Sequence, residues 1–318
     1  MIGLLTLLVP FFGVVALGYG AGRARLVSGG LEALEFFVFS VALPALFFHL
    51  ITTAPPLAGG WAFVATTTFA TYCAFAIAFS IGALVNGGNV PEATIEGLVG
   101  SFSNTAYLAP ALVIAALGTV AAAPVALIYS FDTALLLIVT PLMMALGGTT
   151  RTDLRHLGID IARQVLLNPV IVATLLAFLA AAFGLRMPVP IDSTLAFIGN
   201  AAAPGALFLL GANLATRAFG PIRLEQPLIV AVKLIAHPLI VYLLLSWVGG
   251  FDPLWMSAAI LIAALPPSVG VVGIAGRYRI YAAHASVSVL IGSLAAVVTL
   301  TVAVVLVVQG LLPGDPFR

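Results

Sequence analysis

The sequence predicts an all-α polytopic membrane protein with ten transmembrane helices arranged as two inverted five-helix repeats. Three observations predict it: few charges, ten long apolar stretches, and a helix that recurs with its proline in place. Charged residues make up 7% of the 318 residues, and Ala, Val, Ile, Leu, Met, Phe, Trp, Tyr and Cys make up 62%. Soluble proteins carry roughly 25% charged residues. So few polar groups could not cover a soluble surface, so we assign the chain to the lipid bilayer.

Charge and cysteine content exclude several other classes of protein. The net charge is +1 and no basic run occurs, so nothing favours nucleic acid as a partner. Cys73 is the single cysteine, which excludes an intramolecular disulfide and a cysteine metal cluster, and it is interpreted as a packing residue. The apolar stretch from Met1 to Gly22 lacks a basic start, so it predicts a first membrane helix rather than a cleaved signal peptide. We expect no cofactor and no metal.

Ten apolar stretches are long enough to cross a bilayer, which takes about 20 residues. Short clusters of glycine, proline or charge separate them. The longest connection, after the fifth stretch, is 147–159, and no soluble domain fits between the others. The predicted spans are 3–22, 31–51, 61–85, 93–117, 122–146, 160–184, 193–215, 227–248, 254–275 and 283–309.

The distribution of arginine predicts the orientation of the chain. Basic residues gather on the cytoplasmic side of membrane proteins. Loops after odd-numbered helices hold nine of the 12 basic residues, whereas Arg186 and Arg318 are on the other side. Both termini are therefore expected on the non-cytoplasmic side of the cell (inner) membrane. The nine are Arg23, Arg25, Arg151, Arg155, Arg163, Arg217, Arg223, Arg277 and Arg279.

An internal repeat divides the chain into two halves. Leu31–Ile51 aligns with Ile191–Gly211 at an offset of 160, with five of 21 positions identical, including Pro44 with Pro204. Roughly two matches are expected by chance in so biased a composition. We predict a first repeat over 1–146, a cytoplasmic linker over 147–159 and a second repeat over 160–318. Five helices per half invert the second copy, an architecture typical of secondary transporters.

Interrupted helices at matching places in the two halves predict a binding site. At an offset of 162, a polar stretch in helix four aligns with two adjacent prolines in helix nine, which cannot continue a helix. Two broken helices would direct partial positive charge to one point, which suits an anion. The alternative is a pair of structural kinks. The candidate residues are Ser103, Asn104, Thr105, Pro110, Pro266, Pro267 and Ser268, the last as the N-cap of the second half-helix.

Three ionisable residues lie well inside the predicted bilayer slab, where charge is costly and often functional. Asp132 is near the middle of helix five and could carry a proton, bind a cation or balance a positive side chain. Lys233 and His237 are four residues apart on helix eight and share a face. Lys233 either extends to the interface, pairs with Asp132 or offers charge to an anion. His237 either titrates or is a packing residue.

Several stretches, taken in their order and spacing, make the chain similar to the auxin efflux carrier family. The resemblance implies ten helices, with helices one, two, six and seven as a scaffold and helices three to five and eight to ten as a transport domain. It also implies that helices four and nine cross at the substrate site, elevator-type alternating access, and a homodimer. The stretches are PFFGVVALGYGAGR (10–23), FVFSVALPALFFHLI (37–51), SFSNTAYLAPALVIAALG (101–118), KLIAHPLIVYLLL (233–245) and LPPSVGVVGIAGRY (265–278).

The bile-acid sodium symporter family resembles the chain in architecture but not in its sodium-binding residues. That family uses a glutamate in helix nine with nearby glutamines. Here the region 264–268 is Ala-Leu-Pro-Pro-Ser, without a carboxylate for a hard cation. This departure disfavours sodium coupling of the same design.

These observations favour a secondary transporter of a small organic anion: a mono- or dicarboxylate or an auxin-like acid. Coupling would be to protons, through Asp132 or His237, or absent. The alternatives are a sodium-coupled organic-anion symporter of the bile-acid type, and a transport-like sensor or pore. An enzyme is disfavoured, because the chain has no H-E-x-x-H or G-x-S-x-G motif and a single acid near the midplane.

Overall fold

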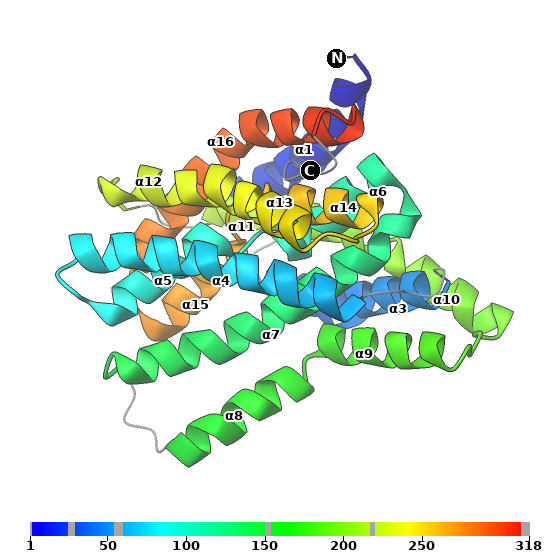
Figure 1. Cartoon of the computed structure of the whole chain (residues 1–318), viewed down its shortest axis with the longest axis horizontal. Helices are drawn as coiled ribbons and strands as arrows, with labels where there is room; N and C mark the ends of the chain where they lie inside the picture. The colour runs from blue at the N-terminus through cyan, green and yellow to red at the C-terminus, as the bar shows by residue number, and fades with distance from the viewer. Residues whose placement is uncertain (1, 25–28, 54–59, 150–153, 217–219, 313–318) are drawn as a thin grey trace. The chain divides into compact units, whose positions relative to one another are not determined.

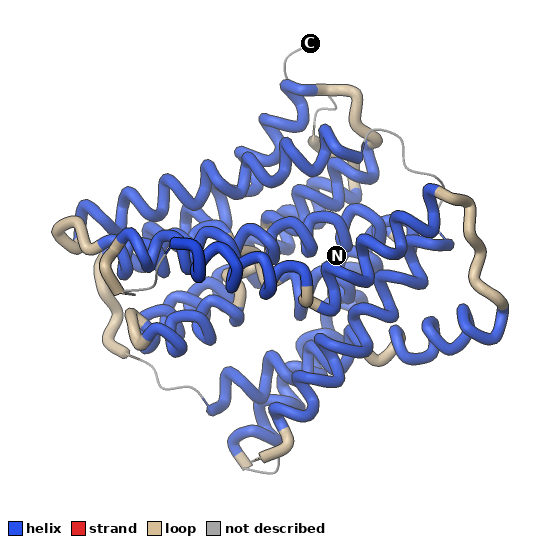
Figure 2. Tube along the Cα trace, turned by 90° about the horizontal axis from the view of Figure 1, so that it is seen from below, coloured by secondary structure: helices blue, strands red, loops and turns tan. Residues whose placement is uncertain are grey.

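The computed structural model describes residues 2–24, 29–53, 60–149, 154–216 and 220–312. Every named element in these residues is a helix, and the helices are joined by short loops (Figures 1 and 2). The backbone hydrogen bonds of a chain in lipid must be made internally, and helices make them within one segment. The prediction of an all-α polytopic membrane protein is confirmed at this level.

Among the described residues, six helical stretches are long and apolar enough to cross a bilayer, and a bent pair of helices would add a seventh. The chain is thus a multi-pass membrane protein. The number ten stays a prediction, because the fourth, sixth and ninth predicted spans are each two shorter helices in the described residues, whereas the first lies over α1 (Ile2–Arg23). The six stretches are Leu31–Thr53, Gly60–Val85, Thr119–Leu146, Val189–Ala215, Glu225–Val248 and Ala282–Val308.

The fourth and ninth predicted helices are each broken into two short halves, as predicted. Helix four consists of α5 (Val90–Ser101) and α6 (Thr105–Leu117). Helix nine consists of α14 (Pro253–Ala263) and α15 (Val269–Tyr278). Each half has 10 to 13 residues, too few to cross a bilayer alone.

The sixth predicted helix, 160–184, is wrong as a single straight span. The structure has α8 (Leu154–Leu166) and α9 (Pro169–Ala182), bent by 61° at the break between them. Asn168 ends the first helix and caps the second: its side chain accepts from the N–H groups of Val170 and Ile171 at 3.1 and 3.2 Å. Pro169 follows at the first helical position, where its missing N–H costs nothing. The predicted linker over 147–159 overlaps α8, and its residues 150–153 lie outside the described part.

Two long helices contain a widened π-turn next to a proline. The first runs through α2 (Leu31–Phe37), the π-turn Val38–Ala42 and α3 (Leu43–Thr53). The second runs through α12 (Glu225–Ala231), the π-turn Val232–Ala236 and α13 (His237–Val248). In the second, the N–H of His237 donates to the carbonyl of Val232, five residues back, just before Pro238, which has no N–H. Such turns are frequent at functional sites.

The chain divides into two compact units, each drawn from both halves of the sequence. The first consists of Met1–Ala58, Thr105–Ser130 and Asn168–Arg217. In it, glycines let α1 (Ile2–Arg23) approach α11 (Ala202–Thr216) closely: a side chain on Gly18 or Gly211 would collide with the backbone of the facing helix. Small residues serve helix packing in lipid in this way. This unit also contains α3, α6, α9 and α10 (Val189–Gly199).

The second unit consists of Gly59–Asn104, Phe131–Leu167 and Ala218–Arg318. It contains α4 (Gly60–Val85), α5, α8, α12 to α15 and α16 (Ala282–Val308), and α7 (Ala122–Leu146) passes into it from the first unit after Ser130. Both helix breaks' connecting residues, 102–104 and 264–268, belong to this unit.

The membrane side of each loop stays a prediction. Of the basic residues on which the orientation depends, Arg25, Arg151, Arg217 and Arg318 lie outside the described residues.

Candidate functional site

The two helix breaks of the second unit lie side by side and pair as short antiparallel strands. Ser103 forms an isolated antiparallel bridge with Pro267. The N–H of Asn104 donates to the carbonyl of Pro266 at 2.9 Å, and the N–H of Ser268 donates to the carbonyl of Phe102 at 2.9 Å. Backbone groups that the broken helices cannot pair internally are therefore paired with each other, as an apolar surrounding requires.

Ser268 caps the half-helix that follows the break, as predicted. Its backbone is extended, and its hydroxyl oxygen accepts from the N–H of Gly270 at 3.2 Å. This capping bond and the strand pairing occupy the N–H groups of residues 104, 268 and 270. The expected set of open backbone amides is therefore smaller than the sequence suggested, and side chains take on more of the work of binding.

The side chain of Asn104 is the one unsatisfied amide in the paired segment. Asn104 is 0% exposed, and neither its Nδ2 nor its Oδ1 has a hydrogen-bond partner among the described residues. Buried amides in proteins are nearly always paired, because an unpaired one loses its water without compensation. The amide of Asn104 therefore has a buried donor, Nδ2, and a buried acceptor, Oδ1, that are available to water or a polar ligand.

A glycine of α16 keeps space for the second break. A Cβ atom on Gly292 would lie 2.5 Å from Cδ of Pro267, far below any normal contact. Sequence reasoning missed Gly292, because one glycine in an apolar helix carries no signal of what packs against it. It belongs to the site as the surface on which Pro267 rests.

The ionisable residues predicted to lie inside the bilayer gather in the second unit. Asp132 on α7 is 6% exposed, and the hydroxyl of Thr71 on α4 lies 3.4 Å from its Oδ1. The same hydroxyl lies 3.4 Å from Nε2 of His237 on α13. Thr71 therefore bridges the carboxyl and the imidazole, a role that sequence reasoning missed.

Lys233, in the π-turn of helix eight, does not extend to an interface. It is 0% exposed, and its ammonium donates to the backbone carbonyl of Ala263, the last residue of α14. Thr71 thus joins Asp132 and His237, whereas Lys233, on the same helix eight as His237, bonds to a backbone carbonyl.

Thr105 and Pro110 are the two candidates that fall in the first unit. Thr105 is the first residue of α6 and is 4% exposed, and Pro110 is a buried residue in the interior of α6. Helix four is broken at 102–104, ahead of both residues. Their place beside a substrate stays a prediction.

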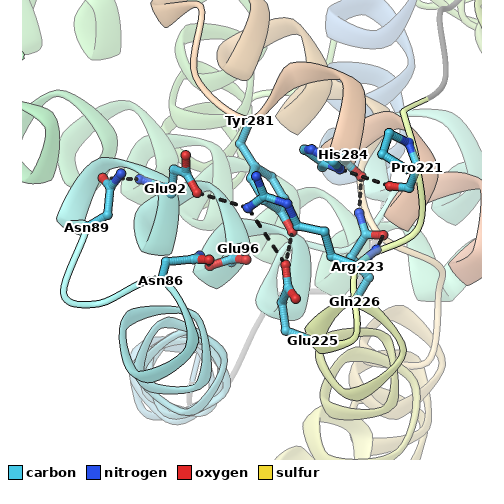
Figure 3. A network of polar contacts seen from close by, with 10 residues as sticks. All are labelled: Asn86, Asn89, Glu92, Glu96, Pro221, Arg223, Glu225, Gln226, Tyr281 and His284. Atoms are coloured by element: carbon cyan, nitrogen blue, oxygen red, sulfur yellow. Dashed lines mark hydrogen bonds and ion pairs between the residues drawn. The ribbon is translucent and has the colours of Figure 1, made fainter.

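A second polar network of the second unit joins three helix ends (Figure 3). Arg223 pairs with Glu92 at 3.1 Å and lies 4.0 Å from Glu225, which accepts from the phenol of Tyr281 at 3.0 Å. Burial and the nearby carboxylates raise the pKa of Tyr281, so its phenol remains a donor. Gln226 donates to the carbonyl of His284 at 2.7 Å. We interpret this network as a clamp on the ends of α5, α12 and α16.

The sequence matches a known protein family over almost its whole length. The model of a family described as "Membrane transport protein" matches residues 4–304. The chain belongs to this membrane transport protein family. This confirms the resemblance to the auxin efflux carriers that the sequence stretches indicated. A curated protein of Rhizobium meliloti (strain 1021), named "Putative malonate transporter", is 39% identical over 315 residues, 98% of each chain.

Membership in the membrane transport protein family gives the site its context. The paired breaks, the unsatisfied amide of Asn104 and the buried ionisable cluster are all on the second unit of a membrane transporter. They involve segments that the two sequence halves contribute separately, 102–104 and 264–268.

Proposed function

We propose that this chain is a secondary transporter that carries a small dicarboxylate of the malonate class across the cell membrane. One observation carries the proposal: the completely buried, unpartnered amide of Asn104 at the paired helix breaks. The family and the 39% identity to a protein named for malonate support the substrate class.

The chemistry at the breaks suits a carboxylate. Nδ2 of Asn104 supplies a completely buried hydrogen-bond donor. Ser268 begins α15, a helix of ten residues whose first turn carries partial positive charge. We assign the carboxylate to Asn104, with Ser103, Pro266, Pro267 and Ser268 shaping the space and Thr105 and Pro110 following on α6.

The proposal includes ten helices in two inverted repeats that work by elevator-type alternating access. The register of the paired breaks supports the repeat, because Asn104 lies opposite Pro266, the residue that the offset of 162 assigns to it. The composition of the first unit supports one part of the proposed scaffold, since Met1–Ala58 of helices one and two groups with Asn168–Arg217 of helices six and seven. The same unit also contains Thr105–Ser130 of helices four and five, which the proposal gives to the transport domain. Movement of the remaining helices against that scaffold, in a homodimer with both termini outside, completes the proposal.

We assign proton coupling to Asp132. A carboxyl that is 6% exposed and accepts from the hydroxyl of Thr71 can bind a proton as the anion binds, which offsets the charge carried. His237 is the second candidate through their shared neighbour Thr71. Helix nine offers no carboxylate for sodium.

Flux into proteoliposomes tests the function and its coupling. We expect saturable uptake of labelled malonate, faster counterflow when unlabelled malonate is inside, and uptake driven by a proton gradient but not by a sodium gradient. Malate, lactate and indole-3-acetate serve as competitors that define the substrate class. A pore would show no counterflow, and uptake driven by sodium alone would contradict the assignment to Asp132. Absence of flux for every anion would overturn the proposal.

Substitution of Gly292 by alanine is expected to reduce malonate transport by about tenfold or more, since overpacking of this kind costs about 1–3 kcal/mol. The new methyl group would overlap Pro267 and displace the paired breaks. Initial rates in proteoliposomes, normalised to the amount of folded protein, measure it. Gly273→Ala is the matched control, because a methyl group at Gly273 on α15 would meet no atom within 4 Å. Equal rates for the two variants would refute the close packing at Pro267.

A further inference from the structure

The side-chain ammonium of Lys233 donates to a backbone carbonyl rather than to a carboxylate. The residue is fully buried in the π-turn of helix eight, and its ammonium donates to the carbonyl of Ala263. Ala263 is the last residue of α14, directly before the break that contains Pro266 and Pro267. A buried ammonium directed at a helix end rather than at a partner carboxylate needs a physical reason.

That reason lies in the two prolines. In an α-helix the carbonyl of a residue accepts from the N–H four residues later. For Ile262 and Ala263 these residues are Pro266 and Pro267, which have no N–H. The N–H of Leu265 donates to the carbonyl of Ile262 at 3.1 Å and satisfies the first. Lys233 satisfies the second, which would otherwise be an unpaired carbonyl within an apolar surrounding.

Four hydrogen bonds pair backbone groups at the break. The carbonyls of Ile262 and Ala263 accept from Leu265 and Lys233, and the carbonyl of Pro266 accepts from Asn104. The N–H of Ser268, which a continuous helix would use for Ala264, donates to Phe102. Lys233 is the one side-chain donor among these bonds. It therefore fixes where α14 ends and where the residues that pair with 102–104 begin.

We propose that Lys233 is a positioning residue, which replaces the backbone donor lost at Pro267 and thereby holds the second break in register with Ser103 and Asn104. It acts on the substrate through the paired breaks and not by contact. The positive charge of the residue would serve Asp132, whereas its hydrogen bond serves the helix end. This inference rests on the proposed function only where it links the breaks to substrate affinity.

Amide hydrogen exchange of the full chain in lipid nanodiscs tests the positioning role without any substrate. We expect Lys233→Met to exchange about tenfold faster at residues 104 and 268, whose N–H groups make the pairing bonds, since a lost buried hydrogen bond has that order of effect. Lys233→Gln keeps a donor without the charge and should restore most of the protection. Gln226→Met is the matched control, because Gln226 is also a buried donor to a backbone carbonyl, that of His284. It should leave exchange at 104 and 268 unchanged.

Malonate transport supplies the second readout. Lys233→Met should raise KM about tenfold with a smaller change in kcat, and Lys233→Gln should restore most of KM. Wild-type exchange at 104 and 268 in Lys233→Met would overturn the proposal. Recovery of transport in the double variant Asp132→Asn with Lys233→Met would also overturn it, because it would reduce Lys233 to a balancing charge.

Two further outcomes have defined meanings. If Lys233→Met does not accumulate as folded protein, Lys233→Gln carries the test alone: protection at 104 and 268 supports the hydrogen bond, and its loss overturns it. If exchange behaves as expected while malonate neither binds nor moves, the positioning role is supported and the proposed function fails.

Discussion

Replacement of Asn104 by aspartate is expected to lower the affinity for malonate by at least about 100-fold. The two side chains have nearly the same shape, so the change adds a negative charge without new volume. Asn104 is completely buried, and an anion bound beside it would face that charge with little screening. Two like charges about 4 Å apart repel by about 4 kcal/mol at an effective dielectric constant near 20, which exceeds a factor of 100 in affinity.

Calorimetric titration of malonate at pH 8, in detergent or nanodiscs, measures the effect. Asn104→Ala removes the amide without adding charge, and a loss of about tenfold is expected for it. Asn89→Asp adds the same charge at an exposed N-cap position of the second unit, between the membrane-crossing stretches, and should leave the affinity within about twofold. Wild-type affinity in Asn104→Asp would remove the paired breaks from the binding model.

The breaks themselves could be predicted from the sequence, because their causes are local. Pro266 and Pro267 stop a helix wherever they occur, and a polar run around Asn104 has no place in an uninterrupted apolar helix. The offset of 162 aligns Asn104 with Pro266 in sequence, and one backbone hydrogen bond, from the N–H of Asn104 to the carbonyl of Pro266, joins these two residues. Helix six itself is predicted over 160–184, whereas the bend within it is not. Its Asn168–Pro169 cap was a readable local signal, but the apolar character on both sides of it favoured one span.

The partners of the buried polar groups could not be predicted, because nothing local names them. Lys233 and His237 were placed on one face of helix eight, yet the acceptor of Lys233 is a backbone carbonyl 30 residues away. A sequence indicates an unpaired backbone carbonyl only where a proline, which has no N–H, follows four residues later. Thr71 is similarly silent: threonines in membrane helices usually bond to the preceding turn, as Thr71 does to Thr67, and only the fold adds Asp132 and His237.

Loss of the Asp132 carboxyl is expected to abolish malonate uptake driven by a proton gradient and to leave malonate counterflow intact. Asparagine cannot bind and release a proton, but its side-chain oxygen can still accept from Thr71. With one proton coupled to each anion, a gradient of one pH unit supports up to about tenfold accumulation, since a unit of pH corresponds to 1.36 kcal/mol. In Asp132→Asn we expect the ratio of internal to external malonate to fall to about one, while malonate counterflow continues at a rate within about threefold of wild type.

Accumulation and counterflow, measured in the same proteoliposomes, separate coupling from movement of the carrier. Asp160→Asn removes an exposed carboxyl on α8 and should accumulate malonate like wild type. His237→Gln decides between the two ionisable neighbours of Thr71. If Asp132→Asn still accumulates malonate and His237→Gln does not, the proton is carried by the imidazole. If both variants accumulate malonate, neither Asp132 nor His237 carries the coupled proton. The buried side chains of Asp132 and Lys233 then serve to stabilise the second unit.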